Sequence, residues 1–181
     1  MDTETKTKEI SGKSTMQEIL EAYPAAKETL FQRYHVGGCS SCAFSPADTL
    51  EQVLSGVGAS DVEDAITFIK KSQEESDGLQ IEPKDLTKLL EEKKVKLIDV
   101  RTPEERRLAY IEGDQLVTQE LAQQIMETWP KDTAVVLYCH KGERSLQAVT
   151  SLSNHGFTNV KSLKGGIDAW SDQVDPLLPR Y

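Results

Sequence analysis

The chain has 181 residues, of which 38% are hydrophobic, so it can form a packed core and is not a disordered polymer. Its formal net charge of −9 argues against a nucleic-acid partner, because phosphate contacts need clustered Lys and Arg side chains. No stretch approaches the ~18 consecutive apolar residues of a membrane span, and the polar start MDTETKTKEISGK lacks the apolar core of a signal peptide, so we expect no membrane partner.

The charge is unevenly distributed along the chain, which indicates two modules. Residues 1–78 carry 7 Lys and Arg against 14 Asp and Glu, whereas residues 79–181 carry 14 against 16. The polar stretch KKSQEESDG, which ends at Gly78, is typical of a helix end that runs into a linker. The sequence therefore predicts a flexible N-terminus over 1–12, a small acidic helical domain over 13–76, a linker over 77–80 and a second domain over 81–181.

Helical periodicity dominates the first module. Thr15 and Glu18 form a capping-box pattern, in which each side chain accepts a hydrogen bond from an otherwise unpaired backbone N–H. Ser60 and Glu63 repeat this pattern ahead of the last apolar stripe. Apolar residues recur at helical spacing in four stretches, over 16–23, 26–34, 50–57 and 62–69. We therefore predict a small all-α domain.

Short apolar runs alternate with helical patterns in the second module. The runs at 95–100, 134–139 and 159–163 are typical of buried strands, and helical spacing follows each of them. Strands that alternate with helices form parallel sheets flanked by helices, and such sheets bind ligands at the carboxyl ends of their strands. Cys139 ends one of these strands, so we expect a site there.

The segment YCHKGERS, residues 138–145, surrounds this cysteine with groups that stabilise an anion. A cysteine reacts as its thiolate, and a free thiol with a pKa of ~8.5 is mostly protonated at neutral pH. A helix predicted to begin near Ser145 directs its unpaired N–H groups and its dipole at the sulfur, and Gly142 lets the backbone turn N–H groups inward. The Lys and Arg of this segment add positive charge. The alternative is an ordinary buried cysteine at a strand end.

Cys139 to Ser145 resembles the active-site loop of the rhodanese (thiosulfate sulfurtransferase) family, whose single-domain members commonly carry Cys-x-x-Gly-x-Arg-Ser. LIDVRTPEE at 97–105 is similar to the family's first strand and acidic turn, and LKGGIDAW at 163–170 to its closing segment. The ending VDPLLPRY resembles tails of rhodanese domains attached to sulfur-carrier-activating enzymes. The resemblance covers residues 79–181 and implies an α/β rhodanese-like domain, a parallel sheet flanked by helices, after the all-α domain.

This resemblance implies a ping-pong transfer of sulfane sulfur that requires no cofactor. Cys139 attacks the outer sulfur of a small anionic donor such as thiosulfate, or of a persulfide donor, and becomes a persulfide itself. Cyanide, a thiol or a protein acceptor then takes that sulfur. The implied active-site loop comprises His140, Lys141, Gly142, Glu143, Arg144 and Ser145. Arg144 either anchors the loop, through a carboxylate such as Asp99, or faces the anion. Asp99 and Arg101 either support catalysis or form a buried ion pair that fixes the fold.

The chain departs from the family pattern over residues 109–114. It reads Ala-Tyr-Ile-Glu-Gly-Asp where the family usually carries Gly-His-Ile-Pro-Gly-Ala, and it keeps Ile111 and Gly113. Because this segment connects and packs, we expect the change to affect local structure and substrate fit more than chemistry.

Two further functions are compatible with the same fold. Dual-specificity phosphatases of the cell-cycle type resemble this chain but have a loop one residue longer, whereas the six residues from Cys139 to Arg144 have the rhodanese length. A phosphate needs the wider ring, which disfavours a phosphatase. The other alternative is a redox or metal-sensing protein whose rhodanese fold is a docking module, and the retained cysteine and loop disfavour it.

A second cysteine site lies in the acidic module. Cys39 and Cys42 form a Cys-x-x-Cys after a Gly pair, and His35 precedes Cys39 by four residues. The surrounding residues 13–75 resemble a family of helical domains of no established function that carry a Cys-x-x-Cys between helices.

Three interpretations of this second site stay open: a dithiol that cycles with a disulfide or accepts sulfur, a Zn or iron–sulfur site, and two ordinary thiols. A metal site normally needs four ligands, so His35, Cys39 and Cys42 would hold a metal only if two subunits shared it. We favour the redox or sulfur-accepting role, with a relay from Cys139. Three cysteines make no disulfide framework, so the expected compartment is the reducing cytoplasm.

Overall fold

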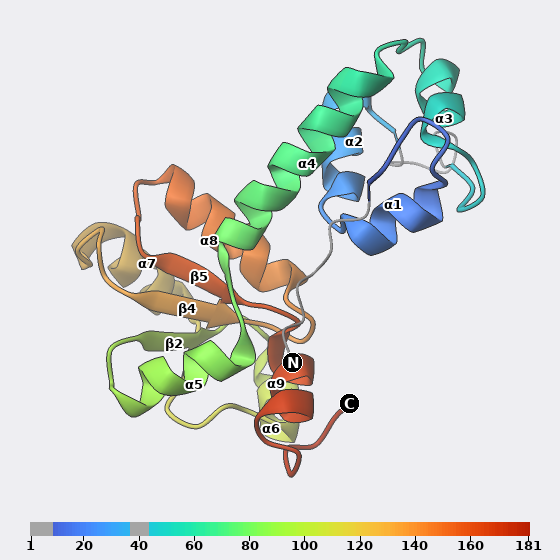
Figure 1. The fold of residues 1–181 in the computed structure, drawn as a ribbon. Coiled ribbons are helices and arrows are strands. Elements are labelled where there is room, and N and C mark those ends of the chain that lie inside the picture. The colour runs from blue at the N-terminus through green and yellow to red at the C-terminus, as the bar shows by residue number, and fades with distance from the viewer. Residues whose placement is uncertain (1–8, 37–43) are drawn as a thin grey trace. The chain divides into compact units, whose positions relative to one another are not determined.

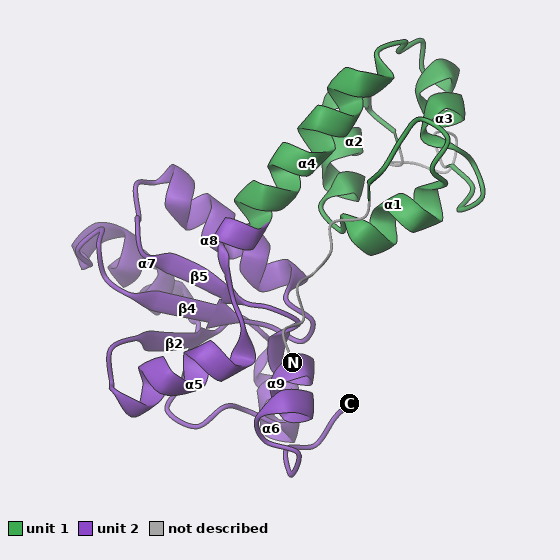
Figure 2. Cartoon of the chain, viewed as in Figure 1, with its two compact units in different colours: residues 1–76 green, residues 77–181 purple. Residues whose placement is uncertain are grey.

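The computed structural model describes residues 9–36 and 44–181, and the chain divides into two compact units, residues 1–76 and 77–181 (Figure 2). Among the described residues, the first unit has one hydrophobic core and the second has two, one on each face of its sheet. Within the described residues, no helix combines the length and the apolar character that a membrane crossing requires.

The described part of the first unit is helical, as predicted. Its helices are α1 (Met16–Ala22), α2 (Ala26–Tyr34), α3 (Leu50–Gly56) and α4 (Val62–Gly78). The capping box predicted at the start of α1 is confirmed: the Thr15 hydroxyl accepts from the Glu18 N–H at 3.3 Å, and the Glu18 carboxylate accepts from the Thr15 N–H at 3.0 Å. The apolar stripes of these helices meet in a single core.

The start of α4 differs from the prediction by one residue. Its first residue is Val62, and the Asp61 carboxylate accepts a hydrogen bond from the Asp64 N–H at 2.9 Å. The capping box predicted at Ser60 and Glu63 is therefore wrong, because Asp61 supplies the acceptor for the first turn.

The linker predicted over residues 77–80 is regular secondary structure. α4 continues through the first two of these residues, and β1 (Gln80–Ile81) follows and pairs in parallel with β5 (Val160–Leu163). The Ser162 N–H donates to the Leu79 carbonyl at 2.8 Å. The sheet of the second unit therefore includes backbone groups of this segment, and the predicted domain bounds stay a prediction.

The second unit is a parallel α/β layer (Figure 1). Besides β1 and β5, its strands are β2 (Lys96–Asp99), β3 (Gln115–Leu116) and β4 (Val135–Tyr138). They are hydrogen-bonded in the order β1-β5-β4-β2-β3, and every pair is parallel. The three strands predicted from apolar runs correspond to β2, β4 and β5, and the predicted fold class is confirmed.

Helices cover both faces of this sheet (Figure 1). They are α5 (Pro83–Glu91), α6 (Pro103–Leu108), α7 (Gln119–Thr128), α8 (Glu143–Asn154) and α9 (Gly166–Gln173). Val136 and Tyr138 of β4 pack into the core formed with α5 and α9, whereas Val135 and Leu137 pack into the core formed with α7 and α8. This burial on both faces makes β4 a central strand, and its carboxyl end leads directly to Cys139.

Candidate active site

The sulfur of Cys139 lies just beyond the end of β4 and receives two hydrogen bonds. The Gly142 N–H donates to Sγ at 3.1 Å, and the Ser145 hydroxyl donates to it at 3.5 Å. The residue is 1% exposed and is a free cysteine. These two donors are placed to hydrogen-bond an anionic group at this position.

The backbone at Gly142 makes this arrangement possible. Gly142 has a φ of +95° and is the N-cap of α8, which begins at Glu143, two residues earlier than predicted. A positive φ is readily adopted only by glycine, and it turns the amide of this residue toward the sulfur. The start of α8 therefore presents its N-terminal dipole to Sγ.

Serine hydroxyls support the loop beneath the sulfur. Ser145 and Ser162 are buried, and their hydroxyl oxygens lie 2.8 Å apart. The Ser145 hydroxyl can also direct its single proton to the Gly142 carbonyl oxygen, 3.1 Å away, instead of to Sγ. Ser162 belongs to β5, the neighbour of β4, so this network ties the loop to the sheet.

The first turn of α9 holds the loop from its other side. The Ile167 N–H donates to the Cys139 carbonyl at 2.9 Å, and the Asp168 N–H donates to the His140 carbonyl at 3.1 Å. α9 follows β5, and β5 pairs with β4, so the residues after these two strands meet at one edge of the sheet. Gly166 packs so closely on this loop that an added Cβ would overlap the carbonyl oxygens of Cys139 and His140.

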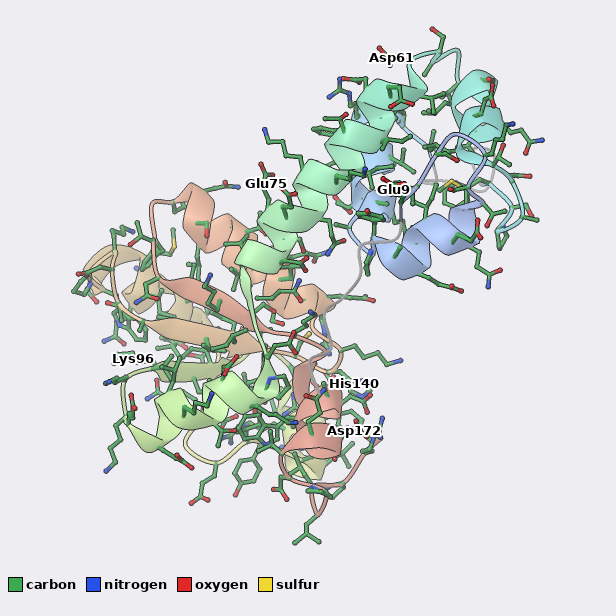
Figure 3. The ribbon with its side chains drawn as sticks, viewed as in Figure 1. Glu9, Asp61, Glu75, Lys96, His140 and Asp172 are labelled. Atoms are coloured by element: carbon green, nitrogen blue, oxygen red, sulfur yellow. The ribbon has the colours of Figure 1, made fainter. Side chains whose placement is uncertain are left out.

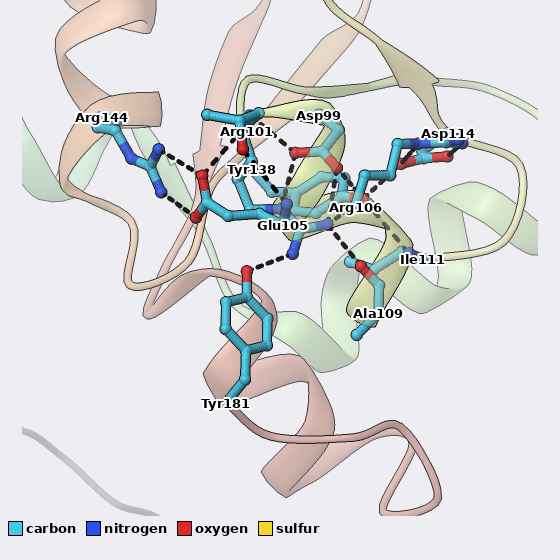
Figure 4. Close-up of polar contacts among 11 residues, drawn as sticks. Asp99, Arg101, Glu105, Arg106, Ala109, Ile111, Asp114, Tyr138, Arg144 and Tyr181 are labelled. Carbon is cyan, nitrogen blue, oxygen red and sulfur yellow. Dashed lines mark hydrogen bonds and ion pairs between the residues drawn. The ribbon is translucent and has the colours of Figure 1, made fainter.

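Arg144 is anchored by Glu105 rather than by Asp99 (Figure 4). Its two terminal nitrogens donate to the two Glu105 carboxylate oxygens at 2.9 and 2.6 Å. The proposed anchor through Asp99 is wrong, because Arg101 already occupies that carboxylate. The pKa of the Arg144 guanidinium is raised, first by the bond to Glu105 and also by the nearby Cys139 sulfur, so this charge serves both the loop and the site.

Glu105 connects the Cys139 loop to α6. Its carboxylate also accepts the Thr102 N–H at 3.1 Å, while its N–H donates to the Thr102 hydroxyl, which completes a capping box. The bond from Arg144 is the largest cause that lowers the Glu105 pKa from 4.5 to about 2, and the Thr102 N–H adds to it.

We expect the contribution of this ion pair to stability to depend on pH. Because the pKa of Glu105 is lowered in the folded chain, the contribution is complete above pH 4.5 and disappears as the pH falls toward about 2. Gln can replace Glu in a capping box, so Glu105→Gln keeps the cap while it removes the charge and one of the two oxygens that accept from Arg144. Urea unfolding should show Glu105→Gln to be less stable by about 1 kcal/mol at pH 7, with the difference shrinking between pH 4 and pH 2. A difference that is the same at pH 7 and pH 2 would contradict the assignment.

Asp99 and Arg101 form a buried ion pair with both side chains 0% exposed. The guanidinium donates to both Asp99 oxygens at 2.9 and 2.7 Å and to the Ala109 carbonyl at 2.8 Å (Figure 4). It also donates to the Tyr181 hydroxyl at 2.6 Å. These contacts join β2 to the segments that contain Ala109 and Tyr181, so they favour the structural role over the catalytic one.

The segment that departs from the family pattern is stabilised by its own polar network. Asp114, whose side chain is 0% exposed, forms an ion pair with Arg106 and accepts a hydrogen bond from the Tyr138 hydroxyl. Burial, followed by the bond to Asp114, raises the pKa of Tyr138 above its usual range, so the hydroxyl stays protonated. Asp114 therefore joins this segment to α6 and β4.

The remaining loop residues lie at the surface. His140 is half-buried, and its ring stacks on that of Tyr181 with centroids 4.4 Å apart and 11° between the planes. Lys141 and Glu143 are exposed. The structure therefore brings Gly142 and Ser145 onto the sulfur of Cys139, while His140, Lys141 and Glu143 form the rim of the loop.

The second cysteine site falls outside the described residues. Cys39 and Cys42 are not described, so their redox, sulfur-accepting and metal interpretations stay predictions. His35 is exposed and ends α2 with a φ of +56°. Among residues 9–36 and 44–181, there is no group of three or more His, Cys, Asp or Glu side chains placed to hold a metal ion.

Glu105, Gly166 and Tyr181 are among the residues of this site that the sequence reasoning did not single out. Glu105 could have been found, because Thr102-x-x-Glu105 is a capping-box pattern that marks the start of α6. Gly166 lay inside a recognised motif without an assigned role. Tyr181 gave no local signal, because its partners His140 and Arg101 lie far from it in the sequence.

A central parallel strand that ends in a cysteine, with the sulfur held at the N-terminus of the next helix, defines an α/β domain with an anion-stabilising cysteine loop. Residues 82–173, half of the chain, match the family described as Rhodanese-like domain. The chain therefore belongs to the rhodanese-like domain family, as its three motifs predicted.

Its relatives include proteins named as sulfurtransferases. The probable adenylyltransferase/sulfurtransferase MoeZ of Mycobacterium tuberculosis is 36% identical over 107 residues, which cover 58% of this chain but only 27% of that protein. A sulfurtransferase of Allochromatium vinosum is 36% identical, and the match covers 50% of this chain and 85% of that protein. The thiosulfate sulfurtransferase GlpE of Vibrio cholerae is 34% identical, and the match covers 45% of this chain and 77% of that protein. These relatives support a sulfur-transfer role in general.

Proposed function

We propose that this chain is a sulfurtransferase that carries sulfane sulfur as a persulfide on Cys139. The observation that carries the proposal is the convergence of the Gly142 N–H and the Ser145 hydroxyl on Sγ at the start of α8. The same donors would stabilise the negative charge of a persulfide, since preorganised N–H groups act on charge without having to reorganise. The name of the Vibrio cholerae relative supports thiosulfate as a donor.

In the first half of the cycle, the Cys139 thiolate attacks the outer sulfur of thiosulfate. A new S–S bond forms on the enzyme, the S–S bond of thiosulfate breaks, and sulfite leaves with the electron pair. In the second half, a nucleophile such as cyanide or a thiolate attacks the terminal sulfur of the persulfide. The product carries that sulfur away, and the Cys139 thiolate is regenerated without a net oxidation.

The loop residues have separate roles in this proposal. Gly142 and Ser145 hold the anionic sulfur, and Arg144, fixed by Glu105, keeps the loop in place and adds positive charge beside it. His140 and Lys141 at the rim attract the anionic donor. Asp99 and Arg101 fix β2 to the segments around the site.

Intact-protein mass spectrometry after treatment with thiosulfate tests the proposal. The unmodified chain should gain one sulfur atom that cyanide removes, and Cys139→Ser should gain none. Cys39→Ser/Cys42→Ser is the matched control, because it removes two thiols and keeps Cys139, and it should gain the sulfur normally. Thiosulfate:cyanide turnover should fall to background in Cys139→Ser alone.

Other results of this experiment would contradict the proposal or would test the predicted relay. No sulfur on Cys139 with thiosulfate or with organic persulfides would overturn the proposal and favour a docking or sensing role. Normal uptake by Cys39→Ser/Cys42→Ser with slower discharge to thiols would instead support the predicted relay between the two cysteine sites. Unchanged discharge to every thiol tested would exclude that relay.

A further inference from the structure

The segment that follows α9 folds back onto the Cys139 loop. The Ser171 hydroxyl donates to the Leu178 carbonyl at 2.7 Å, and the Asp175 N–H donates to the Trp170 carbonyl at 3.1 Å. These bonds turn the chain after α9, so that its last residue, Tyr181, stacks on the ring of His140. The end of this segment, at Tyr181, therefore lies against the rim of the loop.

An acidic side chain of α9, Asp168, lies beside His140 and Lys141 of the rim. Asp168 is in the first turn of α9, and its N–H donates to the His140 carbonyl at 3.1 Å. The bond from Arg180 is the largest cause that lowers the pKa of its carboxyl group, and His140 and Lys141 add to this lowering. An unneutralised carboxylate at this position would repel an anionic donor that approaches Cys139.

Arg180 covers this carboxylate. Its Nε and Nη2 donate to the two Asp168 oxygens at 2.9 and 3.0 Å, and its Nη1 lies 3.4 Å from Asp172. Figure 3 labels Asp172 and His140, which both belong to the second unit. Arg180 is 55% exposed, so its pairs add little to stability, and their effect is on the charge that an approaching ligand meets.

The stacked ring keeps Arg180 at this position. Tyr181 is bonded through its hydroxyl to Arg101 at 2.6 Å and is stacked through its ring on His140. Because these two contacts of Tyr181 already order the backbone beside Arg180, the ion pair with Asp168 costs little additional conformational entropy.

We propose that Arg180 is a specificity-determining residue that admits anionic reagents to Cys139 by neutralising Asp168. That the physiological substrate is an anionic sulfur donor rests on the proposed function. The electrostatic effect itself does not, because any anion that approaches the Cys139 sulfur meets the same charges.

Site-resolved alkylation of Cys139 tests the charge effect without any turnover. Iodoacetate is an anion and iodoacetamide is its neutral analogue of similar size, so the ratio of their rates at the Cys139 peptide reports the local potential. A change in thiolate content affects both rates and cancels in the ratio. Arg180→Gln should lower the ratio by about threefold, the order expected when one partly screened charge is removed.

Two variants separate charge from structure. Asp168→Asn/Arg180→Gln removes both charges, so the ratio should return to that of the unmodified chain. Lys88→Gln removes one positive charge from an exposed pair with Asp85 on α5, and it should leave the ratio unchanged. An unchanged ratio in Arg180→Gln overturns the proposal. So does a double variant that stays as low as the single one, because displacement of the segment would then be the cause.

The sulfur-transfer assay distinguishes this inference from the proposed function. A dianion responds to twice the potential, so kcat/KM for thiosulfate should fall by about tenfold in Arg180→Gln, mainly through KM. Turnover with an unchanged alkylation ratio would overturn the role of Arg180 and leave the sulfurtransferase intact. If Arg180→Gln lowers the alkylation ratio but the unmodified chain takes no sulfur from thiosulfate, the role of Arg180 stands and thiosulfate is excluded as the donor.

Discussion

Replacing Gly166 with alanine should destabilise the second unit by about 3 kcal/mol or more and disrupt the Cys139 loop. Gly166 has a φ of +62°, and its missing Cβ leaves space for the carbonyl oxygens of Cys139 and His140. These oxygens are backbone atoms, so the overlap can be relieved only by moving the loop or α9. We expect urea unfolding to show the loss of stability, and persulfide formation to slow by about 100-fold, as reacting groups are displaced.

Gly156→Ala is the matched control for this effect. Gly156 also has a positive φ, +89°, but an added Cβ there would meet no atom within 4 Å. It therefore isolates the backbone strain, which we expect to cost about 1 kcal/mol with no effect on sulfur uptake. Equal losses in the two variants would show that strain alone acts at Gly166 and that the close contact with the loop does not matter.

Replacing Arg101 with methionine should cost about 3–5 kcal/mol, because the buried Asp99 carboxylate loses the cation that pairs with it. The pair is fully buried, and Arg101 also bonds the Ala109 carbonyl and Tyr181. Urea unfolding at neutral pH measures this loss. A cost below about 1 kcal/mol, the level of a surface pair, would show that the pair does not hold these segments together.

The double variant Asp99→Asn/Arg101→Met tests whether the unpaired charge is the cause. Asn keeps an oxygen that can accept the N–H of residue 101, a bond that is 3.0 Å long in this structure. Because no buried charge remains, the double variant should be more stable than Arg101→Met alone by at least about 1 kcal/mol. If the double variant is as unstable as the single one, the loss comes from packing and from the bonds to Ala109 and Tyr181.

Local patterns in the sequence were sufficient to predict the main elements and the position of the sulfur. The apolar run of β4, followed by Cys139, Gly142 and a helical stripe, encodes a strand, a turn with positive φ and a helix start within a few residues. The short elements β1, β3 and α6 escaped prediction, since two to six residues are too few to show a periodicity.

The partners of the loop were decided by the tertiary structure. β4 lies between β2 and β5, and all three strands are parallel, so the residues that follow each strand meet at one edge of the sheet. This brings Glu105, which follows β2, to Arg144, and brings Gly166, which follows β5, under the carbonyl of Cys139.

The sequence by itself therefore determined the kind of site, a cysteine at a strand end with an anion-stabilising loop, because those interactions are made between near neighbours. Only the tertiary structure decided that Arg144 pairs with Glu105, that Arg101 keeps Asp99, and that Tyr181 lies on His140. A charged or aromatic side chain in a sequence can pair with any of many others. The order of the strands and the path of the chain after α9 determine which of them comes within reach.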